Sequence, residues 1–356
     1  MNIHKFLALF LIFTFGFAGA QISAANNGPL TGKQSCHAVS TETCEIANAL
    51  GRGINMGNML EAPREGDWGI RLDPAFIPIA TEKFKTLRIP VRWTNHAAAT
   101  VDATIDEFFA KRVDKAIDQA LGADAYVIVN QHHYSQLFGD KLQPNEFAVD
   151  PSVIEQRFIN IWQQLANRYK DRSPRLVFEL LNEPHGTLTA EAWNMLASKA
   201  LAVIRQVDRK RTVMIGPTYW NHPKDLEKLK LPDDKNIIVA IHTYDPFNFT
   251  HQGISYMPQF PKGARCCDEK QIRMMEASIE TAVKWSKTNG YPLHLGEFGS
   301  HQAAAMESRE DYTRIMRNIS EKNGIGWTYW EFGWLFGVYD PSKSAWIEPI
   351  RRALLD

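Results

Sequence analysis

The stretch Leu176-Val177-Phe178-Glu179-Leu180-Leu181, followed directly by Asn182-Glu183-Pro184, decides how the rest of the chain is interpreted. A short, largely apolar run of this kind is typical of a parallel strand that is buried on both faces. Glu183 comes where the strand ends, and a carboxylate at that place is unusual as packing. The segment therefore predicts a buried strand with a functional glutamate at its end; a solvent-facing loop glutamate is the alternative.

Seven further runs resemble this one along the 356-residue chain, and longer amphipathic patterns lie between them. Residues 106–121 and 151–169, for example, repeat apolar side chains at helical spacing. Alternating strands and helices without a break in composition predict an α/β fold, namely a single (β/α)8 TIM barrel over residues 51–356. The eight expected strands are 51–57, 86–93, 125–131, 176–181, 212–216, 237–242, 292–296 and 326–330.

The first 20 residues have the pattern of a secretory signal peptide. Lys5 precedes an apolar run, and Ala18-Gly19-Ala20 provides a small-residue cleavage site before Gln21. An uncleaved membrane anchor is the alternative, but the run is short for a membrane span. We therefore expect a secreted or periplasmic protein that has no membrane association once the signal peptide is removed.

Residues 21–50 are interpreted as an N-terminal leader with a possible disulfide. In an oxidising compartment, Cys36 and Cys44 are close enough in sequence to close a small loop. The adjacent residues Cys266 and Cys267 could each bridge elsewhere or could bond to one another, and four cysteines allow three pairings. The pairing stays open from sequence.

Charge and motif spacing exclude several classes of partner. Lys plus Arg and Asp plus Glu both number 40, so the formal net charge is zero, and there is no basic stripe for nucleic acid. No cysteine or histidine cluster has zinc spacing. We expect no metal, no nucleic-acid partner and a monomer; ten Trp residues suit sugar stacking as well as core packing.

A second carboxylate, Glu297, follows the run Pro292-Leu293-His294-Leu295-Gly296 in the same way that Glu183 follows its own strand. The carboxyl ends of barrel strands meet on one face, so glutamates on strands four and seven lie across the barrel mouth from each other. Two carboxyl groups cleave a glycosidic bond by retention when they are about 5–5.5 Å apart and by inversion at about 6.5–9.5 Å. The sequence alone does not give this distance.

Several polar and aromatic residues at the other strand ends are expected to line the same cleft. Arg88 lies inside an apolar strand and needs a carboxylate partner; a structural salt bridge is the alternative. His132 and His133 are adjacent, so we expect one to bind sugar hydroxyls and the other to pack, rather than both to bind one metal. His242 and Tyr244 are two residues apart, so we expect them to point the same way, with Tyr244 near the nucleophile and His242 near the leaving group. Trp330 is expected to stack under a sugar, with core packing as its alternative.

Taken together, these residues resemble glycoside hydrolase family 5, the cellulase family, and most of all its bacterial endo-β-1,4-glucanases. The resemblance covers residues 51–356 in order. It is based on Gly53-Ile54-Asn55-Met56-Gly57-Asn58 with Leu60-Glu61-Ala62-Pro63, Arg88-Ile89-Pro90-Val91-Arg92-Trp93, His132-His133-Tyr134, Asn182-Glu183-Pro184-His185-Gly186, His242-Thr243-Tyr244-Asp245-Pro246-Phe247, His251-Gln252-Gly253, Gly296-Glu297-Phe298-Gly299 and Tyr329-Trp330-Glu331-Phe332.

The resemblance implies a role for each matching residue and no cofactor. It makes Glu183 the acid/base and Glu297 the nucleophile, with Arg88 and Tyr244 flanking the nucleophile. Sugar-binding residues would be Asn182 at the 2-hydroxyl, His132 or His133, His242 and Trp330 beside the scissile bond, and Asn58 and Glu61 further along the cleft.

The expected function is therefore retaining, endo-acting hydrolysis of β-1,4-glucan, a polysaccharide or oligosaccharide substrate. A mannanase, a xyloglucanase or a mixed-linkage glucanase could use the same barrel, because cleft details decide the substrate. A non-catalytic carbohydrate-binding protein is the alternative from another class. The physiological glycan, endo against exo action, the oligomeric state and periplasmic against extracellular location stay open.

Overall fold

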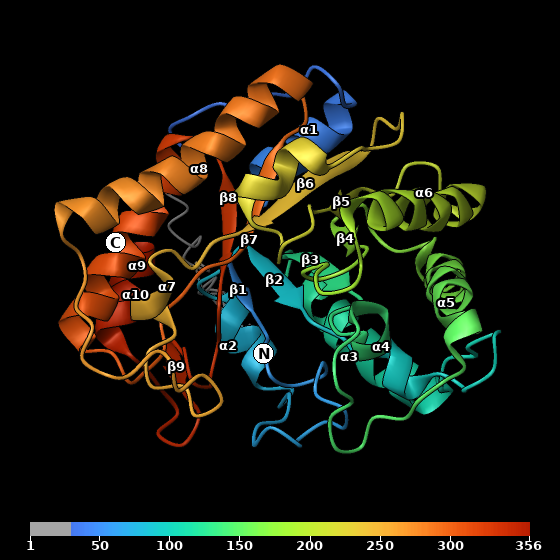
Figure 1. Cartoon of the computed structure of the whole chain (residues 1–356), viewed down its shortest axis with the longest axis horizontal. Coiled ribbons are helices and arrows are strands. Elements are labelled where there is room, and N and C mark those ends of the chain that lie inside the picture. The colour runs from blue at the N-terminus through green and yellow to red at the C-terminus, as the bar shows by residue number, and fades with distance from the viewer. Residues whose placement is uncertain (1–29) are drawn as a thin grey trace, which may run out of the picture.

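The computed structural model describes residues 30–356, and the signal peptide predicted for residues 1–20 lies outside them. Eight parallel strands form one closed barrel in chain order, and β1 closes the ring by pairing with β8 at Gly53 and Thr328 (Figure 1). The predicted (β/α)8 barrel is confirmed. Its strands are β1 (Arg52–Asn55), β2 (Thr86–Ile89), β3 (Tyr126–Asn130), β4 (Leu176–Glu179), β5 (Val213–Ile215), β6 (Ile237–His242), β7 (Leu293–Glu297) and β8 (Gly326–Tyr329).

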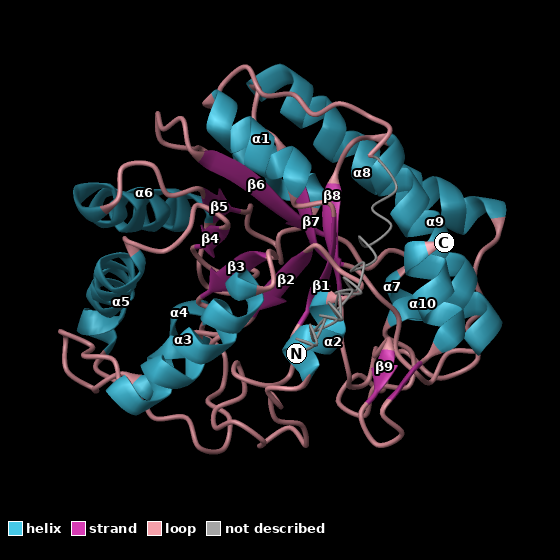
Figure 2. Cartoon of the chain, turned by 180° about the vertical axis from the view of Figure 1, so that it is seen from behind, coloured by secondary structure: helices cyan, strands magenta, loops and turns pink. Residues whose placement is uncertain are grey.

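Helices surround this barrel (Figures 1 and 2). Several of them begin at side-chain caps: Asp106 accepts a hydrogen bond from the Phe109 amide, and Asp268 forms a reciprocal capping box with Gln271. The α-helices after α1 are α2 (Phe76–Thr81), α3 (Glu107–Gly122), α4 (Ser135–Phe138), α5 (Ile154–Tyr169), α6 (Ala190–Val207), α7 (Phe247–Thr250), α8 (Glu269–Asn289), α9 (Met306–Lys322) and α10 (Glu348–Leu355).

The connections depart from a regular β/α repeat in three places. Between β5 and β6 there is only a 3-10 helix, η3 (Pro223–Lys228), and the predicted helix 151–169 begins as the 3-10 helix η2 (Pro151–Val153). Another 3-10 helix, η1 (Trp93–His96), follows β2. After β8 the chain forms a small antiparallel pair, β9 (Tyr339–Asp340) and β10 (Ala345–Trp346).

The bottom end of the barrel, where the strands begin, is closed by helix α1 (Thr41–Ala49). Ser40 caps this helix by accepting a hydrogen bond from the Thr43 amide. The apolar side chains Ile46, Ala47 and Leu50 then pack against barrel residues, which are Ile128, Val177, Met214, Ile238 and Ala240. Helix α1 lies within residues 21–50, the segment interpreted from sequence as a leader, and its apolar side chains pack at the bottom of the barrel.

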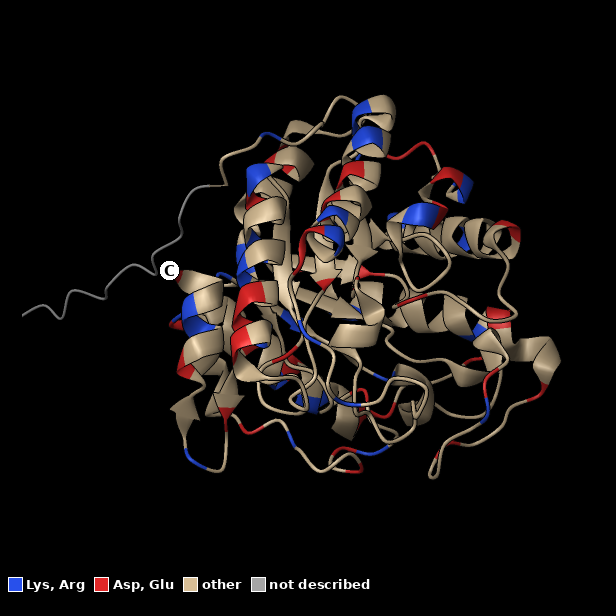
Figure 3. Cartoon of the chain, turned by 60° about the vertical axis from the view of Figure 1, so that its left-hand side comes forward, with Lys and Arg blue, Asp and Glu red and all other residues tan. Residues whose placement is uncertain are grey.

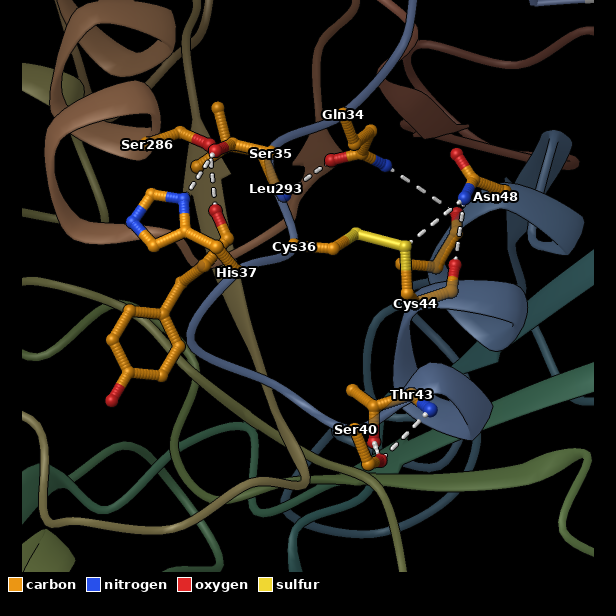
Figure 4. The surroundings of a disulfide bond; sticks show 12 residues. Gln34, Ser35, Cys36, His37, Ser40, Thr43, Cys44, Asn48, Ser286 and Leu293 are labelled. Carbon is orange, nitrogen blue, oxygen red and sulfur yellow. Dashed lines mark hydrogen bonds between the residues drawn. A yellow bond between two sulfur atoms is a disulfide. The ribbon is translucent and has the colours of Figure 1, made fainter.

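Two disulfides are present, which settles the pairing that the sequence left open. Cys36 bonds to Cys44, with Cα atoms 5.7 Å apart, and Cys266 bonds to its neighbour Cys267. Figure 4 shows the first of them between the N-terminal segment and α1. Beside it, the Gln34 side chain accepts a hydrogen bond of 2.5 Å from the Leu293 amide at the start of β7. The N-terminal segment is thus attached to both α1 and the barrel.

Charged residues of both signs are mixed over the outer helices, as Figure 3 shows. Arg168 on α5, for example, pairs with both Glu107 and Asp114 of α3. This mixing agrees with the absence of a basic stripe in the sequence. Within residues 30–356, every helix is too short or too polar to cross a bilayer.

Candidate active site

The two predicted carboxylates meet at the barrel mouth. Glu297 is the last residue of β7, and Glu183 lies four residues beyond the end of β4. One carboxylate oxygen of each lies within 4.8 Å of the other. Glu183 has a backbone φ of 51°, which is uncommon for a residue with a side chain and is found where the surroundings hold a functional residue in place. The short separation belongs to the range of retaining enzymes.

Arg88 organises the charges beneath this pair. Its guanidinium is fully buried in β2 and donates to Glu297 at 2.7 Å and to Glu179 at 2.7 and 3.1 Å. It also donates to the side-chain oxygens of Asn182 and Asn55, at 2.7 and 2.8 Å. Arg88 therefore has two carboxylate partners where the sequence predicted one. Glu179 forms a salt bridge within the barrel, and Glu297 is the predicted nucleophile. Because Arg88 uses the Asn182 oxygen, the Asn182 NH₂ group is left to donate.

The neighbours of Glu297 favour its ionised form. Burial raises the pKa of Glu297, and His242, the positive charge of Arg88 and a 2.8 Å hydrogen bond from the Tyr244 hydroxyl oppose this rise. Burial also raises the pKa of Glu183, to about 7, against smaller opposing effects of His185 and Arg88. Two close carboxyl groups in such surroundings share one proton near neutral pH, and the donors on Glu297 place that proton on Glu183.

His242 lies between the two carboxylates, at the end of β6. Its Nδ1 atom is 2.9 Å from Glu183 and 3.8 Å from Glu297. Burial lowers its pKa to about 4, so the ring is neutral at neutral pH and Nδ1 can accept a hydrogen bond from protonated Glu183. These three residues could also bind a cation. However, Arg88 and Tyr244 already occupy both oxygens of Glu297, which favours acid/base chemistry.

The aromatic side chains that the sequence analysis assigned to sugar binding contact one another. Trp330 is partly exposed, and its ring is parallel to that of His132 at 5.7 Å. His133 is also partly exposed and contacts the edge of Trp68 at 5.6 Å. Burial lowers the pKa of His132 and of His133 well below the usual value, so both rings are neutral. Core packing does not account for the exposed face of Trp330.

Glu61 lies below the cleft surface and not along it. Its side chain is fully buried, one oxygen accepts from the Asn58 amide, and the other accepts from the Met59 amide at 2.9 Å. Asn58 is partly exposed, has a φ of 64° and donates its side-chain NH₂ to Glu331. Asn58 is thus partly accessible, whereas the Glu61 carboxylate holds the backbone of the Asn58 turn from within.

Some residues of the site were not assigned from the sequence. Glu179 and Glu331 are fully buried carboxylates beside Arg88 and Asn58. The pairing of Glu179 with Arg88 could have been predicted from sequence. Each of these charged residues interrupts an apolar strand, and a buried charge needs a partner of opposite sign. Trp220 follows an expected strand and His185 belongs to the Asn182–Gly186 motif, but the sequence assigned no particular role to either residue.

The fold and site define a class of protein: a (β/α)8-barrel glycoside hydrolase with a protonated and an ionised carboxyl group at the barrel mouth. Comparison with known proteins narrows this class. The model of the family described as "Cellulase (glycosyl hydrolase family 5)" matches residues 52–334. The chain belongs to glycosyl hydrolase family 5.

Individual relatives agree with this assignment. Endoglucanase H of Acetivibrio thermocellus is 33% identical over 83% of this chain and 31% of its own length, so the chain spans under a third of that relative. The structure of Thermotoga maritima Cel5A in complex with mannotriose is 41% identical, with a TM-score of 0.81, and covers 87% of this chain and 99% of that one. A hyperthermophilic endo-β-1,4-glucanase in complex with its substrate is 38% identical, with a TM-score of 0.83, over 89% of this chain and 99% of that one.

Proposed function

We propose that this protein is an endo-acting β-1,4-glucanase that hydrolyses its substrate with retention. The observation on which this rests is the pair Glu183 and Glu297, with carboxylate oxygens within 4.8 Å and with opposite protonation favoured by their neighbours. The likeness to endoglucanases supports β-1,4-glucan as the substrate class.

The geometry supplies both half-reactions. Glu183 donates its proton to the leaving glycosidic oxygen while Glu297 attacks the anomeric carbon, which forms a glycosyl ester and releases the leaving sugar. Glu183, now ionised, takes a proton from water, and that water attacks the anomeric carbon from the face that the leaving sugar has vacated, which displaces Glu297 and restores the β configuration. Arg88 and Tyr244 stabilise Glu297 as the leaving carboxylate in this second step.

We assign the sugar beside the scissile bond to the polar and aromatic groups around the carboxylate pair. Asn182 donates to its 2-hydroxyl, the ring stacks on Trp330, and His132, His133 and His242 bind hydroxyls around it. Asn58 binds further along the cleft, with Glu61 supporting it from below. These roles combine the positions of the side chains with the family assignment.

Isosteric variants test the two carboxylates. Glu183→Gln and Glu297→Gln each keep the side-chain volume and remove one acidic group, so turnover of carboxymethyl-cellulose falls at least about 1,000-fold in each. Thermal unfolding by circular dichroism shows whether each variant is folded. Near wild-type turnover by either folded variant would end the assignment.

Retention is tested separately by a proton NMR time course on cellotetraose. The β-anomer is the first product, because two displacements at one carbon restore the original configuration. Early appearance of the α-anomer would show a single displacement, and Glu297 would then not be a nucleophile.

Mannan is a second candidate substrate for the same site, because the Thermotoga maritima structure holds mannotriose as substrate. Parallel assays with soluble β-glucan, galactomannan, xyloglucan and xylan, with product sizing, compare the candidates and separate endo from exo action. A kcat/KM for galactomannan above that for glucan would reverse our order of preference.

We further propose that residues 1–20 are a signal peptide and that the mature protein is a secreted or periplasmic monomer beginning at Gln21. The two disulfides suit an oxidising compartment. N-terminal sequencing of exported protein and light scattering after size exclusion test these points; a retained Met1 or a dimeric mass would contradict them.

A further inference from the structure

His185 lies directly behind the acid/base and has no part in the chemistry above. Its Nδ1 atom is 2.5 Å from the backbone oxygen of Glu183, and its Nε2 atom is 3.1 Å from the Asp140 carboxylate. The side chain is 14% exposed. The two ring nitrogens thus face two hydrogen-bond acceptors, a backbone oxygen and a carboxylate. The ring is thus fixed at two points.

The same ring is enclosed by two aromatic side chains. Phe138 lies 4.2 Å away on one side, and Trp220 stacks at 5.0 Å with an interplanar angle of 16°. The Trp220 amide also donates to the Pro184 oxygen at 3.2 Å, next to the acid/base in the chain. The indole is 45% exposed. His185 therefore connects the backbone of Glu183 to an exposed aromatic surface.

The turn that follows Glu183 is packed tightly against helix α4. Gly186 has a φ of 64°, and a side chain there would place Cβ 2.1 Å from the Phe138 oxygen. That same oxygen accepts a hydrogen bond from the Thr187 amide at 2.8 Å. A glutamate with positive φ persists only where its surroundings hold it. The bond from His185 to the Glu183 oxygen is one of these restraints.

We propose that His185, anchored by Asp140, is a positioning residue that aligns the Glu183 carboxyl with a leaving sugar stacked on Trp220. This inference rests on the proposed hydrolase function. The acid protonates the leaving oxygen, so the leaving sugar lies on the Glu183 side of the scissile bond. Trp220 is an exposed ring attached to that side, and an indole face suits the apolar face of a sugar. One histidine thereby orients both proton donor and leaving group.

Two aryl cellobiosides measure the acid step apart from the rest of the reaction. Dinitrophenolate leaves without protonation, whereas phenolate needs the proton from Glu183. His185→Gln removes the donor at the Nδ1 position, so kcat/KM falls about 10- to 100-fold for phenyl β-cellobioside and under about threefold for 2,4-dinitrophenyl β-cellobioside. His185→Asn keeps a donor near the Nδ1 position and recovers most of the loss. Both variants lose the ring that stacks on Trp220, so this loss does not contribute to the difference between them.

Two further variants distinguish alignment of Glu183 by His185 from a general loss of structure. Trp220→Ala lowers kcat/KM for cellotetraose and leaves the ratio between the aryl substrates unchanged, since it removes the platform and not the restraint. His37→Gln, exposed at the opposite end of the barrel, leaves all three rates unchanged. Thermal unfolding confirms that each variant is folded.

Equal losses on both aryl substrates, or no recovery in His185→Asn, would overturn the proposal and leave His185 a purely structural residue. Failure of the proposed function is distinguishable from this result. In that case the wild-type protein cleaves neither aryl substrate, or Glu183→Gln shows no selective loss on phenyl β-cellobioside.

Discussion

Arg88 is the residue on which the charge balance of the cleft depends. One buried guanidinium faces two buried carboxylates and two amide oxygens, and these fix the direction of Asn182 as well as the charge of Glu297. A lysine could not reach these partners together, because it lacks the planar fork of donors.

Removing this guanidinium tests its double role. Arg88→Met keeps an extended apolar side chain but leaves Glu179 and Glu297 buried without their cation, so the protein loses about 3–5 kcal/mol of stability. Burial then raises the pKa of Glu297 unopposed by Arg88, and kcat/KM falls at least about 100-fold. Urea unfolding and steady-state kinetics measure both. Arg52→Met is the matched control, since Arg52 pairs with Glu321 at 2.7 Å at the bottom end; it loses stability and keeps turnover. Full activity in Arg88→Met would refute the role.

The pKa of Glu183 fixes the alkaline limit of activity. Burial raises it to about 7, and the protonated form is the active one, so kcat/KM falls as pH rises through about 7. The pH profile of kcat/KM on phenyl β-cellobioside shows this limb, and the dinitrophenyl substrate, which needs no proton, lacks it. An alkaline limb of equal position and depth on both substrates would assign it to another group.

At the scale of elements, helix α1 and the Cys36–Cys44 disulfide lie at the bottom end of the barrel, opposite the two catalytic carboxylates. The disulfide closes a loop between residues eight apart, which restricts the unfolded chain, and the helix covers the apolar bottom end. Stability and chemistry thus depend on opposite ends of the same strands.

The Cys36–Cys44 bond is therefore expected to contribute stability alone. Replacing both cysteines by serine lowers the free energy of unfolding by about 2–3 kcal/mol, from loop closure. Turnover well below the melting temperature stays the same. The pair Cys266→Ser and Cys267→Ser is the control, because adjacent residues close no loop and the loop-closure contribution is absent. Melting temperatures by calorimetry compare them; equal shifts would mean that loop closure is not the cause.

Elements differed in how far the sequence could predict them. Every strand was located, because continuous apolar runs are distinctive, but β4 ends at Glu179 and not at residue 181. The residues beyond leave the sheet to bring Asn182 and Glu183 to the cleft. Helix α1 was missed because its nine residues have few apolar positions, and its helical state depends on the barrel it covers.

At the scale of the whole molecule, partly exposed aromatic rings occur in two groups. Trp330, His133 and Trp68 are partly exposed and are joined by ring contacts through the buried His132, and Trp220 stacks on His185 close to Glu183 in the chain. The family residues in this arrangement were predictable from motifs. The orientations of Glu61, His185 and Trp220 were not, because they depend on loops from different repeats meeting in space.

This distribution predicts that longer substrates are cleaved faster. Binding energy from sugars away from the scissile bond is available to the transition state, so kcat/KM rises at least about tenfold from cellotriose to cellopentaose. Chromatography of timed digests measures both rates. Trp68→Ala reduces the advantage of the longer substrate, whereas equal rates for both oligosaccharides in the wild type would indicate a short, exo-type site.

The closed bottom end has a practical consequence. Arg52, at the start of β1, donates to the Leu355 oxygen at 2.6 Å, and the Gln34 side chain accepts from the start of β7. The first and last described segments thus both leave the barrel on the side away from the mouth. A bead, electrode or carrier protein coupled through either segment would hold the enzyme with its cleft facing outward, so immobilised material should keep its access to long, insoluble glycan chains.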